Sequence, residues 1–214
     1  MPERLPHLPE IISVETVARA RLASLGLTLE ELANKERVLD IGAKGCEIER
    51  AAVFHSINSV VSVDKKFPSS VLASGMRVVR GDAKSLDLPE NSADMILVRS
   101  SAYYYTKTER ETLEILERLN RILKEGGEQR VHPARFGHIL EALMAENPDF
   151  RNARAKQPNK RSAKDLNIIK FNDNLANLRT VDFLKQRGIF VKKQEGLEPN
   201  AEANFKEYLS IPKF

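Results

Sequence analysis

The stretch VLDIGAKG, residues 38–45, decides the fold of this chain. Its apolar run Val38–Ile41 stops at Gly42, which is typical of a buried strand that enters a tight loop. The next residues, CEIERAAVFHS, are helical in character. We therefore expect a strand, a glycine turn and a helix in this order.

Four further strands follow at intervals long enough for crossover connections. We expect them in INSVVSVDKK, ending at Asp64; in MRVVRGDAKSLDLP, ending near Gly81–Asp82; in SADMILVRSSAYYY, from near Asp94 to Arg99–Ser100; and in the short, polar EQRVHPARF. Strands separated in this way indicate a mostly parallel sheet with helices on its faces.

An amphipathic helix, TERETLEILERLNRILKEGG, lies between the fourth and fifth strands, and Gly126 is its expected stop. After a later helix, NLANLRTVDFLKQRG, two segments indicate strands: GIFVKKQEG and NFKEYLSIPKF. Their connection is short and helix-free, so they should pair antiparallel. The prediction is an α/β, Rossmann-like, doubly wound and mostly parallel seven-stranded sheet with a C-terminal antiparallel hairpin.

Length and composition place limits on the function. The 214 residues fit one domain, 1–214, with a helical lead-in over 1–36 and an inserted cap or loop over 133–170. No segment approaches the ~20 apolar residues of a membrane span, and we expect no signal peptide and no membrane partner. One cysteine, Cys46, and scattered histidines predict neither a disulfide nor a metal site, and favour the cytoplasm.

Acidic residues stand at three consecutive strand ends. Asp40 and Gly42 mark the end of the first strand, Asp64 the second and Asp82 the third. Ligands of a doubly wound sheet bind beyond the carboxyl ends of its strands, and a carboxylate after the second strand can accept hydrogen bonds from ribose hydroxyls. Each feature alone is common in ordinary turns and caps, but together they predict a nucleoside site.

The segments VLDIGAKG, VSVDKK, RGDAKSLDLPENSADMILVRSS and LNRILKEGGEQRV resemble the motif series of class I S-adenosylmethionine-dependent methyltransferases, from about Arg37 to Val131. The resemblance implies that S-adenosylmethionine is the cofactor. Its methionine end would lie at Asp40 and Gly42, its ribose at Asp64 and its adenine at Lys65, Asp82 and Ala83. The full set of cofactor-binding residues implied is Asp40, Gly42, Ala43, Lys44, Asp64, Lys65, Asp82, Ala83, Arg99 and Ser100.

The glycine loop departs from the family pattern, because Lys44 and Cys46 replace its second and third glycines. Three arrangements fit Lys44: an ion pair with the methionine carboxylate, a pocket narrowed by its bulk, or a side chain that points to solvent. The departure keeps open a non-catalytic cofactor-binding or interaction protein on the same fold. A nicotinamide-dependent oxidoreductase fits less well, because GAKGCE lacks the Gly-x-Gly-x-x-Gly pattern.

The methyl acceptor is less well defined, and no catalytic residue can be assigned. Tyr103, Tyr104 and Tyr105 follow the fourth strand. For any single tyrosine we favour packing under the next helix or simple exposure, but we expect at least one of the three near the pocket. His132 is a candidate base or a structural histidine. The fourth strand lacks the Asn/Asp-Pro-Pro-aromatic motif of enzymes that methylate exocyclic amines of bases.

A basic run from Arg151 to Lys164 has six cationic and no acidic residues, although the formal net charge of the chain is only +4. Such a run could bind an RNA backbone, or it could be a solvated loop, which we favour because it has no aromatic residue for stacking on bases. The sequence thus predicts methyl transfer to a small molecule, with an RNA acceptor as the alternative.

Overall fold

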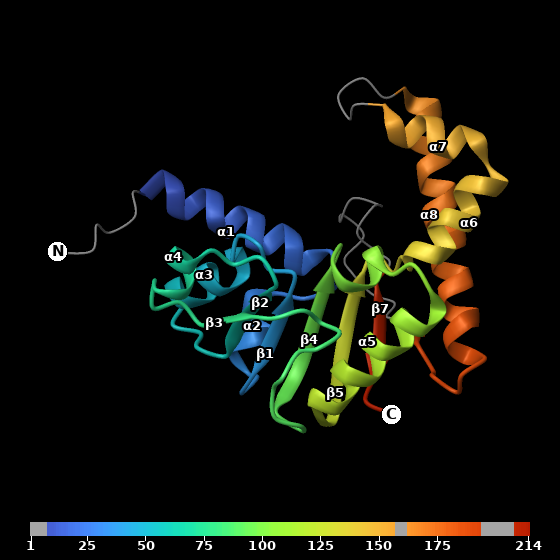
Figure 1. The fold of residues 1–214 in the computed structure, drawn as a ribbon. Helices are drawn as coiled ribbons and strands as arrows, with labels where there is room; N and C mark the ends of the chain where they lie inside the picture. Colours follow the sequence, from blue (N-terminus) through green and yellow to red (C-terminus); the bar gives the residue numbers. More distant parts are fainter. Residues whose placement is uncertain (1–7, 157–161, 194–207) are drawn as a thin grey trace.

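One sheet forms the centre of the molecule (Figure 1). The computed structural model describes residues 8–156, 162–193 and 208–214. The strands are β1 (Val38–Ile41), β2 (Val60–Asp64), β3 (Val78–Arg80), β4 (Ala93–Arg99), β5 (Leu123–His132), β6 (Lys192–Lys193) and β7 (Leu209–Pro212). Their spatial order is β3-β2-β1-β4-β5-β7-β6.

Strands β1 to β5 run parallel, and β7 lies antiparallel between β5 and β6. This confirms the expected α/β fold with a mostly parallel sheet and a C-terminal antiparallel pair. The sheet is seven strands wide only when the two-residue strand β6 is counted. The chain order reverses direction at β1 and β4, and in such sheets the crevice at that switch point is where ligands bind.

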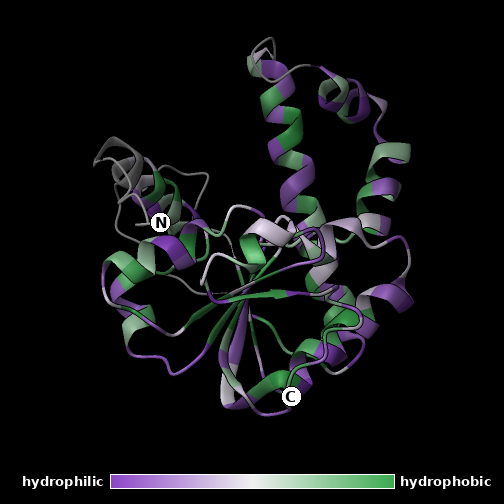
Figure 2. Cartoon of the chain, turned by 60° about the vertical axis from the view of Figure 1, so that its left-hand side comes forward, coloured by the Kyte–Doolittle hydropathy of each residue, from purple (hydrophilic) through white to green (hydrophobic). Residues whose placement is uncertain are grey.

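Helices cover both faces of the sheet. They are α1 (Leu8–Ala23), α2 (Leu29–Ala33), α3 (Glu47–Phe54), α4 (Ser69–Leu72), the 3₁₀ helix η1 (Ala102–Tyr105), α5 (Glu109–Ile122), α6 (Gly137–Glu146), α7 (Pro148–Ala155) and α8 (Ala163–Lys185). Strands β1, β2 and β4 are hydrophobic along most of their length, as expected for a sheet buried on both sides, whereas β5 and β6 are largely polar, and Figure 2 shows both colours in the sheet.

Successive residues of a strand point to opposite faces, and the core is divided accordingly. Val38 and Leu97 belong to the cluster that contains Leu22 of α1, whereas Leu39 and Ile96 belong to the cluster under α5. The same alternation directs Asp40 and Arg99 to the side of α1.

Helix α5 ends earlier than the sequence predicts, at Ile122 and not at Gly126. Leu123 has extended backbone angles, is fully buried and pairs with Ala93 of β4, so the strand begins before the expected stop. Gly126 has a φ of +73° within β5, near the register shift between Ala93 and Met95. Pairing with β4 outweighs the local helical preference of these residues.

Helices α6, α7 and α8 form a protrusion above the carboxyl ends of the strands, which we call the helical cap, residues 137–185 (Figure 1). Pro148 is the first residue of α7, where its missing N–H costs nothing. Thr180 of α8 donates a hydrogen bond to the carbonyl of Ala134 (3.2 Å), which ties the cap to the end of β5.

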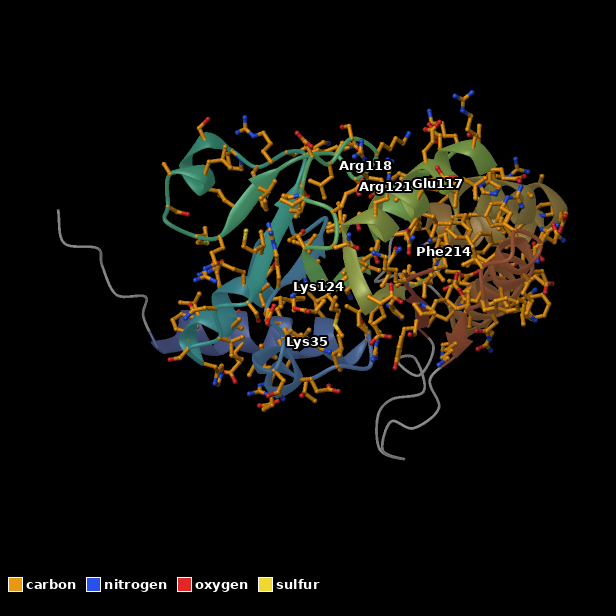
Figure 3. The ribbon with its side chains drawn as sticks, turned by 90° about the horizontal axis from the view of Figure 1, so that it is seen from below. Lys35, Glu117, Arg118, Arg121, Lys124 and Phe214 are labelled. Carbon is orange, nitrogen blue, oxygen red and sulfur yellow. The ribbon has the colours of Figure 1, made fainter. Side chains whose placement is uncertain are left out.

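The end of the chain lies against α5, on the side opposite the cap. Seen from below, Phe214 lies near Glu117, Arg118 and Arg121 (Figure 3). Asn120 holds it through two hydrogen bonds, Nδ2 to the Phe214 carbonyl (2.7 Å) and Phe214 N–H to Oδ1 (3.0 Å). Strand β7 is thereby fixed at the edge of β5.

Candidate functional site

A cavity of about 560 Å³ opens at the carboxyl ends of β1, β2 and β3, and we call it the glycine-loop cavity. Its size is within the usual range of small-molecule sites. Seven of the ten residues assigned from the sequence line it: Gly42, Lys44, Asp64, Lys65, Asp82, Ala83 and Ser100. The structure thus brings together residues from four strand ends.

At Gly42 the backbone of the loop passes very close to Ser101. The φ of Gly42 is +81°, a conformation that L side chains rarely adopt, and a Cβ at this position would lie 2.2 Å from the Cβ of Ser101. Ser101 is fixed there because its hydroxyl donates to the carbonyl of Ile41 (2.7 Å). Only glycine therefore allows the two strand ends to approach each other and keep the backbone open to a ligand.

Asp64 and Asp82 lie on the same cavity and each stabilises its own turn. Asp64 Oδ1 accepts the N–H of Lys66 (2.7 Å), and Asp82 Oδ1 accepts the N–H of Lys84 (3.1 Å). Within the described residues, no hydrogen bond reaches Asp64 Oδ2. Asp82 Oδ2 lies 3.6 Å from the amine of Lys65. Asp64 therefore has one carboxylate oxygen available for a ligand.

Lys44 is exposed and forms part of the cavity lining, and the cavity keeps its volume beside it. Cys46, the other replacement in the loop, is buried and left-handed (φ +53°) directly before α3. It packs with Ala43 and Phe67 in a small apolar cluster. Ala43 therefore lies behind the loop and not on the cavity.

Asp40 and Arg99 also do not line the cavity, although the resemblance places both at the cofactor. The alternation along β1 and β4 turns them towards α1, where Arg99 Nε donates to the hydroxyl of Ser24 (3.1 Å). Asp40 is 3% exposed, and its Oδ2 has no hydrogen-bond partner among the described residues. Burial raises the pKa of Asp40 to about 7, against the nearby charge of Arg21.

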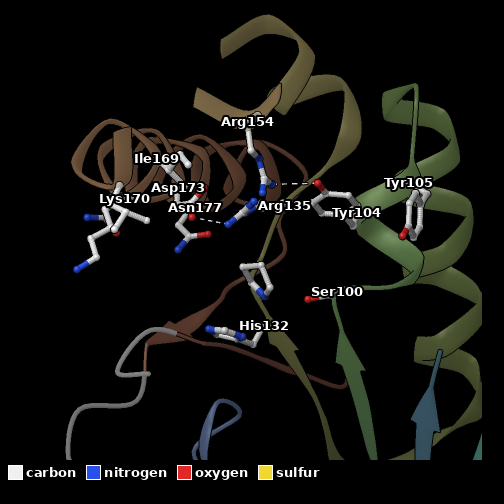
Figure 4. A pocket seen from close by; sticks show the side chains of 13 residues that line it. Ser100, Tyr104, Tyr105, His132, Arg135, Arg154, Ile169, Lys170, Asp173 and Asn177 are labelled. Atoms are coloured by element: carbon white, nitrogen blue, oxygen red, sulfur yellow. Dashed lines mark hydrogen bonds and ion pairs between the residues drawn. The ribbon is translucent and has the colours of Figure 1, made fainter. Parts of the chain in front are cut away.

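A second cavity of about 730 Å³ lies between the sheet edge and the helical cap, and we call it the cap cavity (Figure 4). Ser100 and His132, from the ends of β4 and β5, form its floor, and α7 and α8 close it from above. Ser100 and Tyr105 line both cavities, so the two adjoin. Ser100 is left-handed (φ +47°), and its N–H donates to the His132 carbonyl (2.9 Å).

The three tyrosines after β4 have different places. Tyr103 is buried in the core and donates to Gln129 Oε1 (2.6 Å). Tyr104 lines the cap cavity, and the largely exposed Tyr105 lines both cavities. The expectation that at least one tyrosine lies near the pocket is confirmed.

His132 lines the cap cavity, and its Nδ1 is buried without a hydrogen-bond partner in the described part of the chain. Burial, followed by the charges of Arg99 and Arg135, lowers its pKa to about 4. The imidazole is therefore neutral at neutral pH. It has the hydrogen-bonding capacity of a binding residue and lacks the partner expected of a structural histidine.

A cluster around Arg135 was missed by the sequence analysis. Arg135 is 8% exposed, pairs with Asp173 of α8 and lies over the ring of Tyr104 (5.9 Å to the centroid). Arg154 of α7 donates to the Tyr104 hydroxyl (3.0 Å). The sequence showed only an arginine three residues after His132, in a segment expected to be a polar strand. It could not show the partners, because Asp173 is 38 positions from Arg135 and Arg154 is 50 positions from Tyr104.

The basic run is not a solvated loop along its whole length, because its first part is helical. Arg151 and Arg154 lie on α7. Lys156 donates to Asp165 (2.7 Å), and Lys164 lies on α8. Lys160 and Arg161 lie outside the described residues. Of the run, Arg154 alone contributes to the cap cavity lining that the structure describes.

Part of the chain is similar to a known protein family. Residues 39–130 match the family model described as a methyltransferase domain. This part of the chain is therefore similar to methyltransferase domains. S-adenosylmethionine is its expected cofactor. No curated protein matches the sequence.

Solved structures share the fold of this chain. A candidate S-adenosyl-L-methionine-dependent methyltransferase from Methanococcus maripaludis superposes with a TM-score of 0.51 at 17% identity, over 100% of this chain and 96% of the other. A SAM-dependent methyltransferase from Aquifex aeolicus gives 0.50 at 15% identity, over 97% and 98%. At these identities the likeness concerns the fold alone.

The residues of the glycine-loop cavity fit S-adenosylmethionine. A Cβ at Gly42 would fill the approach that the backbone leaves open, and Asp64 Oδ2 is available to accept hydrogen bonds from hydroxyls. The part of the chain that the structure describes contains no His/Cys/Asp/Glu group suited to a metal, and no described helix is long and apolar enough to cross a bilayer.

Proposed function

We propose that this chain transfers the methyl group of S-adenosylmethionine to a small-molecule acceptor held in the cap cavity. One observation carries the proposal: the cap cavity and the glycine-loop cavity share Ser100 and Tyr105. A donor in one cavity and an acceptor in the other would meet at this shared wall. Alignment of two bound reactants is the main contribution that a protein makes to such a transfer.

The chain's own residues would hold the cofactor as follows. Asp64 would accept the ribose hydroxyls, Lys65, Asp82 and Ala83 would lie at the adenine, and Gly42 would let the backbone approach the methionine end. When bound, S-adenosylmethionine supplies an electrophilic methyl group, so the protein needs no nucleophile of its own. Neutral His132 would accept a hydrogen bond from the acceptor, although a pKa of about 4 makes it a weak base.

A small molecule is the better acceptor for this geometry. The cap cavity has a volume of about 730 Å³, and α7 and α8 close it from above. Among the basic residues from 151 to 164, Arg154 faces the cavity and Lys156 is paired with Asp165. A continuous basic surface for an RNA backbone is therefore not supported by the described part of this segment.

Calorimetric titration with S-adenosylmethionine tests the proposal. Asp64→Asn removes the charge that would accept the ribose hydroxyls and keeps an oxygen for the Lys66 turn. A hydrogen bond to a charged group contributes about 1.5–3 kcal/mol, so affinity should fall roughly 10- to 100-fold. Asp87→Asn, at an exposed carboxylate outside the cavity lining, is the matched control. Absence of heat from the wild-type protein at millimolar ligand would instead support a non-catalytic interaction protein.

A further inference from the structure

The cap cavity contains more positive than negative charge. Arg135, Arg154 and Lys170 line it, and Asp173 is its only carboxylate among the described residues, which leaves a formal surplus of two positive charges. His132 adds none, since its pKa is lowered to about 4. The walls beside these groups are apolar or aromatic, from Ile169, Leu166 and the tyrosine rings.

The two guanidinium groups lie close together in this cavity. Figure 4 shows Arg135 and Arg154 side by side, with Tyr104 next to them and Ser100 and His132 below. The pKa of Arg135 is lowered, by burial first and also by the charge of Arg154. Two like charges in a partly desolvated site repel each other, and an anion between them relieves both the repulsion and the desolvation.

The positive charges of Arg135 and Arg154 are only partly neutralised by other groups of the protein. Asp173 pairs with Arg135, whereas the hydrogen bond of Arg154 goes to a neutral hydroxyl, and no carboxylate of the described chain lies within ion-pair distance of Arg154. In addition, Arg135 Nε and Asp173 Oδ1 are buried without hydrogen-bond partners in the described residues. One donor of Arg135 and the positive charge of Arg154 are thus left without a counterpart among the described residues, and both arginines line the cavity.

We propose that the methyl acceptor is a small carboxylate, held by Arg154 and Arg135 under the helical cap with its apolar body along Tyr104, Tyr105 and Ile169. This rests on the proposed function, because it identifies the occupant of the acceptor cavity. A carboxylate matches the planar fork of a guanidinium and can accept two parallel hydrogen bonds from it. Lys170, exposed on α8, contributes charge at the mouth.

Binding of benzoate tests this proposal without requiring turnover. Benzoate, its neutral isostere benzamide and the cation benzylammonium are titrated into the full chain and followed by ligand-observed NMR. Benzoate should bind at least about tenfold more tightly than the other two, and Arg154→Gln should remove most of that preference. Arg151→Gln, on the same helix but exposed and outside the cavity lining, is the matched control and should change nothing.

A second variant keeps the test informative if loss of Arg154 disturbs the cap. Lys170→Gln changes an exposed residue and should weaken benzoate a few-fold while the thermal unfolding curve stays unchanged. Equal binding of benzoate and benzamide to the wild-type protein, or a preference that survives Arg154→Gln, overturns the proposal. S-adenosylmethionine is titrated into the same samples as a control. If the wild-type protein binds S-adenosylmethionine but shows no preference for benzoate, this inference is refuted and the proposed function still stands.

Discussion

Replacing Asp40 by asparagine should remove one contribution of defined sign to the pH dependence of stability. The pKa of the Asp40 carboxyl rises from 3.8 to about 7 on folding, because burial disfavours its charged form. Between these values the native carboxyl keeps a proton that the unfolded chain has lost. The native state then binds more protons at this group, so the contribution of Asp40 to the free energy of unfolding falls as the pH rises from 4 to 7.

The size of the effect follows from the shift. About three pKa units at roughly 1.4 kcal/mol each give on the order of 4 kcal/mol. The asparagine side chain cannot ionise, so the difference in unfolding free energy between Asp40→Asn and wild type should move in favour of the variant by this order of magnitude between pH 4 and pH 7. A pH-independent offset from the new amide group does not affect this slope.

Urea unfolding at half-unit pH intervals measures the difference. His132 acts in the opposite direction, since its lowered pKa makes the native state bind fewer protons between about pH 4 and 6.5. Its contribution is common to both proteins and cancels. Asp87→Asn, at an exposed position, should give a curve parallel to wild type. If Asp40→Asn is also parallel, Asp40 is ionised in the native protein and our account of its burial is wrong.

Two further predictions concern fixed geometry. Gly42→Ala should lower the free energy of unfolding by about 1–2 kcal/mol for its left-handed backbone and by ~1–3 kcal/mol for overlap with Ser101, and it should also weaken S-adenosylmethionine binding. Gly75 has the same sign of φ and no atom within 4 Å of an added Cβ, so Gly75→Ala should lose the backbone contribution alone. Equal losses for the two variants in urea unfolding would contradict the overlap with Ser101. Tyr103→Phe leaves buried Gln129 Oε1 without its donor and should cost about 1–3 kcal/mol of unfolding free energy; a change under ~0.5 kcal/mol in the same assay would contradict this.

The parts of the fold that depend on local patterns could be predicted from the sequence. Strand β1 has the expected bounds, and Asp64 and Asp82 lie at one sheet edge because parallel strands bring their carboxyl ends together. The end of α5 could not be predicted in this way. The stretch from Leu123 to Gly126 continues the helical pattern, but its pairing with β4 depends on residues about 30 positions earlier.

In the candidate site, too, features that depend on local pattern could be predicted, and contacts between distant segments could not. The alternation in β1 predicts the face of the sheet to which Asp40 points, because Asp40 shares that face with Val38. The resemblance to the family motif gives the position of Asp40 in the sequence but not the face of the sheet to which its side chain points. The Arg135–Asp173 pair and the Arg154–Tyr104 hydrogen bond exist only once α7 and α8 have folded over the sheet. Contacts of this range have no periodic signal in the sequence.

The helical cap has a consequence for how this domain could diversify. Its three helices, α6 to α8, follow one another directly in the sequence, and Thr180 of α8 is hydrogen-bonded to Ala134, close to the end of β5. Apart from Ser100, Tyr104 and Tyr105, the residues that line the cap cavity lie within 132–177, while those that line the glycine-loop cavity lie within 41–115. Under the proposed function, the choice of acceptor and the binding of the methyl donor thus depend largely on separate stretches of one polypeptide. We expect exchange of the cap helices to alter which molecule is modified while the donor cavity stays intact.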